Sequence, residues 1–187
     1  MEYKDELDRQ LFEEGIIKYD EQNKTIKILG AITAISATNF LKCFKKFEEL
    51  GFEKIDLLIN SQGGDGFAAN KIAAAIYRSK ISVRGINIGL VYSAAIYIFE
   101  SCNFRTSLIK GRFAMHKGTY WSKADGKQID QPDEFCLNLE KMNGDYIAYR
   151  IGTTLEIIDA WEVAEKKWNA EEALKDNLID EILYDYP

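Results

Sequence analysis

Residues 85–99 read GINIGLVYSAAIYIF, and this stretch decides the fold. It begins as a β-strand, and we expect a turn at Gly89 ahead of an apolar run that starts with Ser93. No charged residue follows until Glu100, so the run predicts a helix that is buried on most sides. Serine is a favoured N-cap residue, but a serine at a helix N-terminus also lies among unpaired backbone N–H groups. Ser93 is therefore either a helix cap or a reactive hydroxyl.

The same order of strand and helix recurs on both sides of this stretch. Strands are predicted at residues 55–60, 81–88, 106–108 and 112–116, and helices at 67–80 and from residue 93 onward. The first of these strands, IDLLIN, is short and mostly apolar, as expected inside a covered sheet. Strands that alternate with helices in this way are typical of an α/β fold with largely parallel pairing.

The N-terminal part of the chain adds three elements. Residues 1–15 carry apolar side chains at four-residue spacing, which predicts a short amphipathic helix or a partly ordered arm. Two strands at 16–19 and 25–29 predict a hairpin. A helix is predicted at 36–50, with one face formed by Phe40, Phe44 and Phe47.

The C-terminal part adds a loop and three helices. Residues 117–131 are polar and rich in turn formers, which predicts a loop, and a long helix is predicted at 132–149. An apolar stripe along that helix consists of Phe135, Leu139, Met142, Tyr146 and Tyr149. Two capping boxes predict further helix starts, Thr153 with Glu156 and Asn169 with Glu172. Residues 178–183 predict a closing strand.

Composition excludes several classes of protein. The 187 residues are enough for one domain, residues 1–187, with a sizeable core. The net charge of −6, with no basic stripe, argues against nucleic acid as a partner. Cys43, Cys102 and Cys136 match no metal-ligand spacing and fit a reducing compartment, so we expect no metal and a cytoplasmic location. We see no secretory signal and no apolar run of membrane-spanning length.

Several side chains could together perform acyl transfer. This chemistry requires a nucleophile, a base, a group that orients the base, and donors for the oxyanion. Ser93 supplies a hydroxyl, and His116 is the only histidine and so the only imidazole base. Backbone N–H groups of Gly64 and Ala94 could bind the oxyanion, and Gly63 could let a substrate approach the backbone. Two simpler interpretations stay open at this stage: the diglycine as a strand-to-helix turn, and His116 as a structural residue.

Four motifs, in order, resemble the proteolytic subunit of the Clp protease (ClpP). The segments that carry the resemblance are INSQGG at 59–64, GLVYSAAI at 89–96, RFAMH at 112–116, and WNAEEA at 168–173 followed by NLID at 177–180. They are similar to the family's I-N-S-P-G-G, G-x-A-x-S-x-x-A, R-x-M-x-H and L-S-A-x-E-A motifs. The resemblance covers about residues 55–183 and, more loosely, residues 25–54. It implies an α/β fold of the ClpP/crotonase type, a spiral of β-β-α units with a protruding handle helix.

The resemblance also implies roles for individual residues. Ser93 would be the nucleophile, His116 the general base, and Glu165 the third member of the triad, a position usually held by aspartate. Gly64 and Ala94 would form the oxyanion hole, and Gly63 and Gly64 would bind substrate. No cofactor and no metal is implied. Residues 1–20 would be an N-terminal arm, and 117–149 the handle loop and helix.

By the same resemblance, the protein would be a serine endopeptidase that cleaves peptides or unfolded proteins inside an oligomeric chamber. It would form a heptameric ring, two of which can stack, and work with an AAA+ unfoldase, with no nucleic acid and no membrane as partner. Gln62 replaces a proline, Ala95 replaces a glycine and Tyr92 is bulky, so the chain is a divergent member. The alternatives are a crotonase-like acyl-CoA enzyme and a catalytically inactive ClpP-like scaffold subunit.

Overall fold

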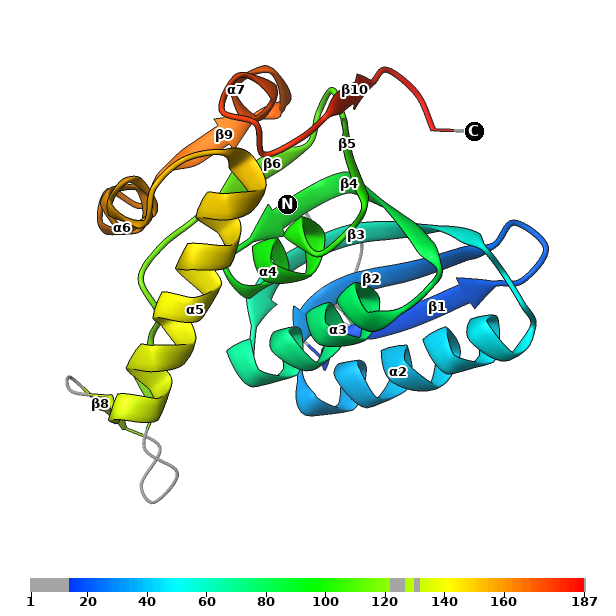
Figure 1. Cartoon of the computed structure of the whole chain (residues 1–187), viewed down its shortest axis with the longest axis horizontal. Helices are drawn as coiled ribbons and strands as arrows, with labels where there is room; N and C mark the ends of the chain where they lie inside the picture. The colour runs from blue at the N-terminus through cyan, green and yellow to red at the C-terminus, as the bar shows by residue number, and fades with distance from the viewer. Residues whose placement is uncertain (1–13, 122–126, 130–131, 187) are drawn as a thin grey trace, which may run out of the picture. The chain divides into compact units, whose positions relative to one another are not determined.

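A computed structural model describes residues 14–121, 127–129 and 132–186 (Figure 1). The chain packs as two compact units. The first comprises Met1–Ala114 and Lys167–Pro187, and the second Met115–Lys166. The helix or arm predicted at residues 1–15 lies almost wholly outside the described residues. No helix within the described part is both long and apolar enough to cross a membrane.

The first unit is built on a mostly parallel sheet. Its strands are β1 (Ile16–Asp20), β2 (Thr25–Ile32), β3 (Lys54–Gly64), β4 (Ser82–Tyr92), β5 (Phe104–Leu108), β6 (Arg112–Ala114), β9 (Lys167–Asn169) and β10 (Glu181–Leu183). The main order is β1-β2-β3-β4-β5-β10, and β6 pairs with both β4 and β9. The predicted hairpin is confirmed as the antiparallel pair β1–β2, and β6–β9 is also antiparallel. All other pairs in this sheet are parallel, as the strand–helix rhythm predicts.

The first unit also contains, among its described residues, the helices α2 (Ala34–Glu49), α3 (Gly66–Arg78), α4 (Ala94–Glu100) and α7 (Ala170–Lys175). Figure 1 shows α2 and α3 side by side against the sheet. Helix α2 begins with a capping box in which Thr33 and Ser36 each accept a backbone N–H bond from the other. The three phenylalanines predicted on its inner face, Phe40, Phe44 and Phe47, are all buried. The apolar periodicity of this segment therefore identified the face that packs in the core.

A buried ion network ties α4 to the C-terminal segment. The Arg105 side chain is only 5% exposed and pairs with Glu100, which is fully buried, and with Asp180 at 2.7 Å. The Arg105 backbone N–H donates to Asp180 as well. Burial opposes the charge on Arg105, but the two carboxylates still raise its pKa above the ordinary value. The guanidinium therefore remains charged, and its partners offset the cost of burying it.

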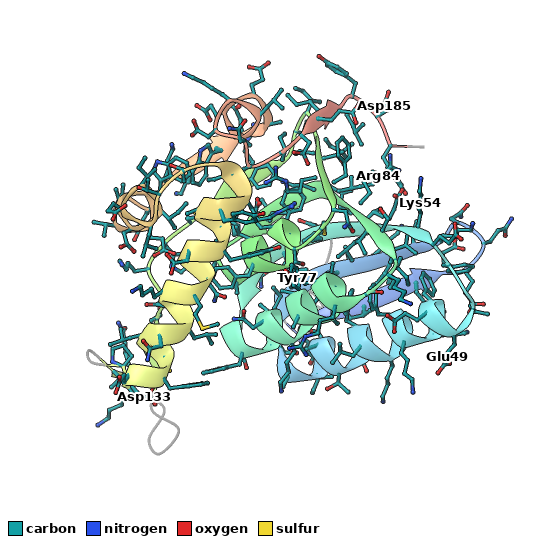
Figure 2. All side chains as sticks on the ribbon, in the orientation of Figure 1. Glu49, Lys54, Tyr77, Arg84, Asp133 and Asp185 are labelled. Carbon is teal, nitrogen blue, oxygen red and sulfur yellow. The ribbon has the colours of Figure 1, made fainter. Side chains whose placement is uncertain are left out.

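The end of the chain is held at the edge of β3 and β4. Arg84 of β4 forms a salt bridge with Asp56 of β3, and the hydroxyl of Tyr186 donates to the same carboxylate at 3.2 Å. Figure 2 shows Arg84 close to the C-terminal segment that carries Asp185. These contacts are partly exposed, so removing one partner should cost less stability than removing one partner of the buried Arg105 network.

The second unit contains a hairpin and two helices. The hairpin, β7 (Tyr120–Trp121) with β8 (Gln128–Ile129), is antiparallel and lies where the sequence predicts only a loop. Helix α5 (Glu134–Ile151) is capped by Asp133, and α6 (Leu155–Val163) packs against it. A Cβ at Gly144 would lie 2.6 Å from Leu155 Cδ1, so glycine permits this close approach. Short two-residue strands carry too weak an alternation to be recognised from sequence.

Three predictions about the C-terminal part of the chain have different outcomes. The stripe predicted on α5 is an outer face, since Phe135, Met142 and Tyr149 are exposed. The capping box predicted at Thr153 and Glu156 is wrong, because the N-cap of α6 is Thr154 and its side chain makes no cap bond. The other predicted box is confirmed, with Asn169 and Glu172 bonded reciprocally at the start of α7.

Candidate active site

Strand β4 runs to Tyr92 without the turn that the sequence predicts at Gly89. A register shift occurs here instead, between the pairs of Ile59 and Ser61 with β4. Asn60 accepts a bond from Leu90 N at 3.0 Å, and Asn87 accepts one from Gly89 N at 2.9 Å. The two amide side chains therefore satisfy backbone groups at the bulge, and the strand continues toward Ser93. Glycine is needed because a Cβ at position 89 would lie 2.5 Å from the Asn60 oxygen.

Ser93 sits at the turn between β4 and α4 in a strained conformation. Its φ of 53° and ψ of −127° are unusual for a residue with a side chain. Its N–H donates to Ala114 O at 2.9 Å. Ser93 occupies the N-cap position of α4, but its hydroxyl makes no cap bond. The interpretation as a simple helix cap therefore fails, and the strained backbone is the kind found at functional sites.

The diglycine lies directly against this turn. Gly63 and Gly64 have φ of 93° and 142° and pair with β2 as the last residues of β3. They are not a strand-to-helix turn, because α3 starts only after Asp65, whose carboxylate accepts bonds from Phe67 N and Ala68 N. A Cβ at Gly63 would lie 2.8 Å from Ser93 Cβ and 3.0 Å from Ala94 N. Glycine thus keeps open the space beside the hydroxyl.

Four of the predicted site residues come together in the first unit. Gly63, Gly64, Ser93 and Ala94 lie on adjacent segments of β3, β4 and α4. Ala94 is the first residue of α4, where a helical N–H has no acceptor within the helix. The arrangement therefore places a hydroxyl beside a backbone amide that can donate to a developing negative charge.

The other two predicted residues, His116 and Glu165, belong to the second unit. The antiparallel ladder of β6 and β9 ends with Ala114 opposite Lys167, and Met115 N donates to Lys166 O at 3.0 Å. The ladder does not continue further, because Lys166 N donates to Trp161 O and Glu165 has a φ of 48°. Both side chains are exposed. His116 and Glu165 each lie two residues along the chain from the last pair of this ladder.

One ring nitrogen of His116 has a backbone partner. Its Nδ1 lies 2.7 Å from the backbone oxygen of Lys117. A carbonyl oxygen only accepts, so Nδ1 is the donor in this contact. Nε2, the nitrogen that a general base uses to take the proton of a serine, is not engaged by it.

Three nearby carboxylates differ in their partners. Lys117 Nζ lies 3.4 Å from Asp159 and 3.9 Å from Glu162. Burial raises the pKa of Glu162 to about 7, against the opposing effect of Lys117. Glu165, at a φ of 48°, has no side-chain hydrogen bond within the described residues. Glu165 is thus the carboxylate not already paired with Lys117.

Sequence reasoning did not single out Lys117, whose backbone oxygen contacts the imidazole and whose ammonium pairs with Asp159 and Glu162 of α6. Its position directly after the only histidine was the signal available. Within residues 14–121, 127–129 and 132–186, no group of three or more His, Cys, Asp or Glu side chains could hold a metal ion.

Comparison with known proteins agrees with this fold. The Clp protease family profile matches residues 9–185. ClpP1 from Listeria monocytogenes superposes with a TM-score of 0.78 at 24% identity, covering 88% of this chain and 94% of that one. A mutant of the same protein gives a TM-score of 0.77 at 23% identity, covering 88% and 93%. None of the curated proteins compared is a significant match.

Proposed function

The chain belongs to the Clp protease family, and on that premise we propose that it is a serine endopeptidase acting on peptides or unfolded proteins. The observation that carries the proposal is the strained Ser93 turn, with its uncapped hydroxyl and Gly63 packed against it. Strain of this kind is stored where a nucleophile must be presented rather than buried. Family membership also favours a peptidase over an acyl-CoA enzyme.

In the proposed mechanism, Ser93 Oγ attacks the peptide carbonyl carbon while His116 Nε2 takes the hydroxyl proton. The carbonyl oxygen becomes an oxyanion, which the N–H groups of Gly64 and Ala94 bind. The C–N bond then breaks, and the imidazolium returns its proton to the leaving amine. Water hydrolyses the acyl-enzyme by the same steps, with His116 again as base. These residues need no metal or cofactor for this chemistry.

We assign Glu165 as the group that orients and stabilises the imidazolium. Its support is its position, two residues from the end of the β6–β9 ladder as His116 is, and the absence of a side-chain hydrogen bond within the described residues. The chain spacing supports the pairing with Ser93, since His116 follows Ala114 by two residues and Ala114 O holds Ser93 N. Charge on the imidazole during attack would draw the carboxylate of Glu165 toward it.

The wider organisation follows from the family. We propose that residues 1–187 act as one peptidase domain, with 117–149 as handle, in a heptameric ring that pairs with a second ring. The exposed α5 side chains Phe135, Met142 and Tyr149 support burial of this helix in an assembly. An AAA+ unfoldase partner and a cytoplasmic location are part of the same proposal.

The deciding experiment is labelling by a fluorophosphonate or β-lactone probe, read by intact-protein mass spectrometry alongside cleavage of short peptides. We expect wild type to be labelled once per chain and Ser93→Ala to lose both labelling and cleavage. Ser82→Ala, which alters an exposed serine at the other end of β4, should match wild type. Labelling that persists in Ser93→Ala would identify another nucleophile.

An inactive scaffold subunit is the second candidate. It is favoured by one observation, that Nδ1 of His116 donates to Lys117 O rather than to Glu165. The same probe separates the two, because a scaffold subunit in its own homo-oligomer would leave Ser93 unlabelled.

A further inference from the structure

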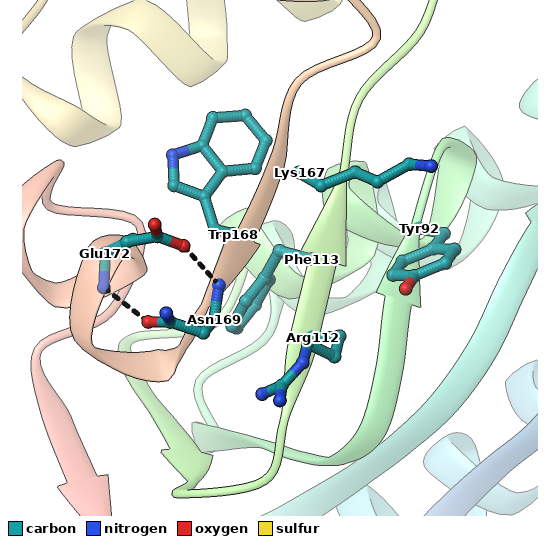
Figure 3. Close-up of a pocket in the computed structure, with 7 residues that line it drawn as sticks. All are labelled: Tyr92, Arg112, Phe113, Lys167, Trp168, Asn169 and Glu172. Atoms are coloured by element: carbon teal, nitrogen blue, oxygen red, sulfur yellow. Dashed lines mark hydrogen bonds between the residues drawn. The ribbon is translucent and has the colours of Figure 1, made fainter.

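A pocket of about 450 Å³ opens in the first unit where β4, β6 and β9 lie side by side. Its lining includes Tyr92, Arg112 and Lys167, one from each strand, and Glu172 from α7. Figure 3 shows these side chains around the pocket, with Phe113 and Trp168 between them. Tyr92 is the residue directly before Ser93.

The strand register explains the shape of this pocket. Tyr92, Ala114 and Lys167 stand in one row across the three strands, so their side chains point to the same face. Ala114, the middle member, is not among the lining residues, so this row contributes Tyr92 and Lys167 to the pocket. Arg112 lies in a second row on that face, two residues along β6.

The pocket has a net positive charge, from the two cations Arg112 and Lys167 against the one carboxylate of Glu172. Arg112 donates only to the backbone oxygens of Gly111 at 3.1 Å and Lys110 at 3.4 Å. Within the described residues, neither Arg112 nor Lys167 forms a salt bridge with a carboxylate. The one acidic lining residue, Glu172, already accepts the N–H bond of Asn169 in the α7 capping box.

We propose that this pocket binds a carboxylate of the peptide substrate, close to the bond that Ser93 cleaves. Arg112 and Lys167 supply charge-assisted hydrogen bonds, and the Tyr92 hydroxyl supplies a further donor. The strands that line the pocket also hold the nucleophile, because Ala114 O of β6 accepts the Ser93 N–H. The proposal rests on the proposed peptidase function, and it makes Arg112 and Lys167 determinants of specificity.

The test compares short fluorogenic peptides that differ by one Glu-to-Gln exchange, moved through each position around the scissile bond. A second series compares a free C-terminal carboxylate with the C-terminal amide, which separates the two sources of the carboxylate. For wild type we expect kcat/KM to favour the carboxylate about tenfold at one position, as charged hydrogen bonds in a solvent-accessible pocket allow. The preference should weaken as salt is raised.

Three variants make the measurement specific. Arg112→Gln with Lys167→Gln should bring the Glu/Gln ratio near one, and the single change Lys167→Gln, at an exposed residue, should reduce it in part. Lys110→Gln removes a neighbouring exposed charge outside the lining and should keep the wild-type ratio. A ratio that is the same in wild type and in both pocket variants overturns the proposal.

Binding of the same peptides to Ser93→Ala, followed by fluorescence anisotropy, separates the pocket from the chemistry. Tighter binding of the Glu peptide with no cleavage by wild type would support the pocket and refute the peptidase function. Cleavage without any carboxylate preference would refute the pocket alone. Loss of assembly in Lys167→Gln with an unchanged ratio would also refute it, since the pocket would then be a contact between copies.

Discussion

Replacing Gly63 with alanine tests whether the diglycine exists to leave room beside Ser93. The added Cβ would lie 2.7 Å from Tyr92 O, 2.8 Å from Ser93 Cβ and 3.0 Å from Ala94 N. Backbone atoms on two sides cannot move away without shifting β4 or α4. The φ of 93° adds strain, because a side chain is disfavoured there.

Two separate costs together give the loss of stability expected for Gly63→Ala. Positive φ costs about 1–2 kcal/mol for a residue with a Cβ, and overpacking against fixed neighbours costs about 1–3 kcal/mol. Together they predict a loss of about 2–5 kcal/mol, or a fall in Tm of about 4–20 °C for a chain of this size. Probe labelling of Ser93 should fall further than stability alone explains, since the Cβ contacts the nucleophile and the Ala94 amide.

Two control glycines isolate each cost in thermal unfolding followed by circular dichroism. Gly51→Ala has a φ of 72° with no atom within 4 Å, so it should show the strain alone. Gly66→Ala has neither strain nor neighbours within 4 Å and should be neutral or slightly stabilising. The reasoning is refuted if Gly63→Ala unfolds at the temperature of Gly51→Ala and is labelled at the wild-type rate.

Three further predictions concern charged groups. Arg105→Met should lower the free energy of unfolding by about 3–5 kcal/mol, because it leaves Glu100 buried without its cation. Arg84→Met should lower it by about 0–1 kcal/mol. Equal losses for the two variants in denaturant unfolding would contradict this. Glu162 has a pKa raised to about 7, so the folded chain binds more protons than the unfolded chain and wild type should lose stability as pH rises from about 4.5 to 7. Glu162→Gln should remove that loss. If the Tm difference between wild type and Glu162→Gln is the same at pH 4 and at pH 8, the pH dependence does not come from Glu162. Glu165→Gln should keep the fold but slow acylation of Ser93 strongly, while Glu162→Gln changes acylation little; wild-type acylation in Glu165→Gln would leave a Ser-His dyad.

The sequence alone determined the elements whose signals are local. Apolar periodicity placed the buried face of α2, with Phe40 and Phe44, because a helix repeats its inward positions every three to four residues. The capping box of Asn169 and Glu172 marked α7, since its two bonds span only three residues. Alternating strands and helices predicted the parallel sheet, because right-handed crossovers leave few other arrangements.

Tertiary structure decided what depends on distant neighbours. The sequence predicts a turn at Gly89. In the structure, the side chain of Asn87 accepts the Gly89 N–H and that of Asn60 accepts the Leu90 N–H, so Gly89 stays within β4. The hydroxyl of Ser93 reads as a cap, but the backbone bond to Ala114 O holds the turn in a conformation where it caps nothing. The pairing of β6 with β9 joins segments about fifty residues apart, and no local pattern encodes that register. Only the long-range pairing of these strands sets Tyr92 and Lys167 on one face. Backbone hydrogen bonds between strands fix the register through contacts that the chain makes after folding.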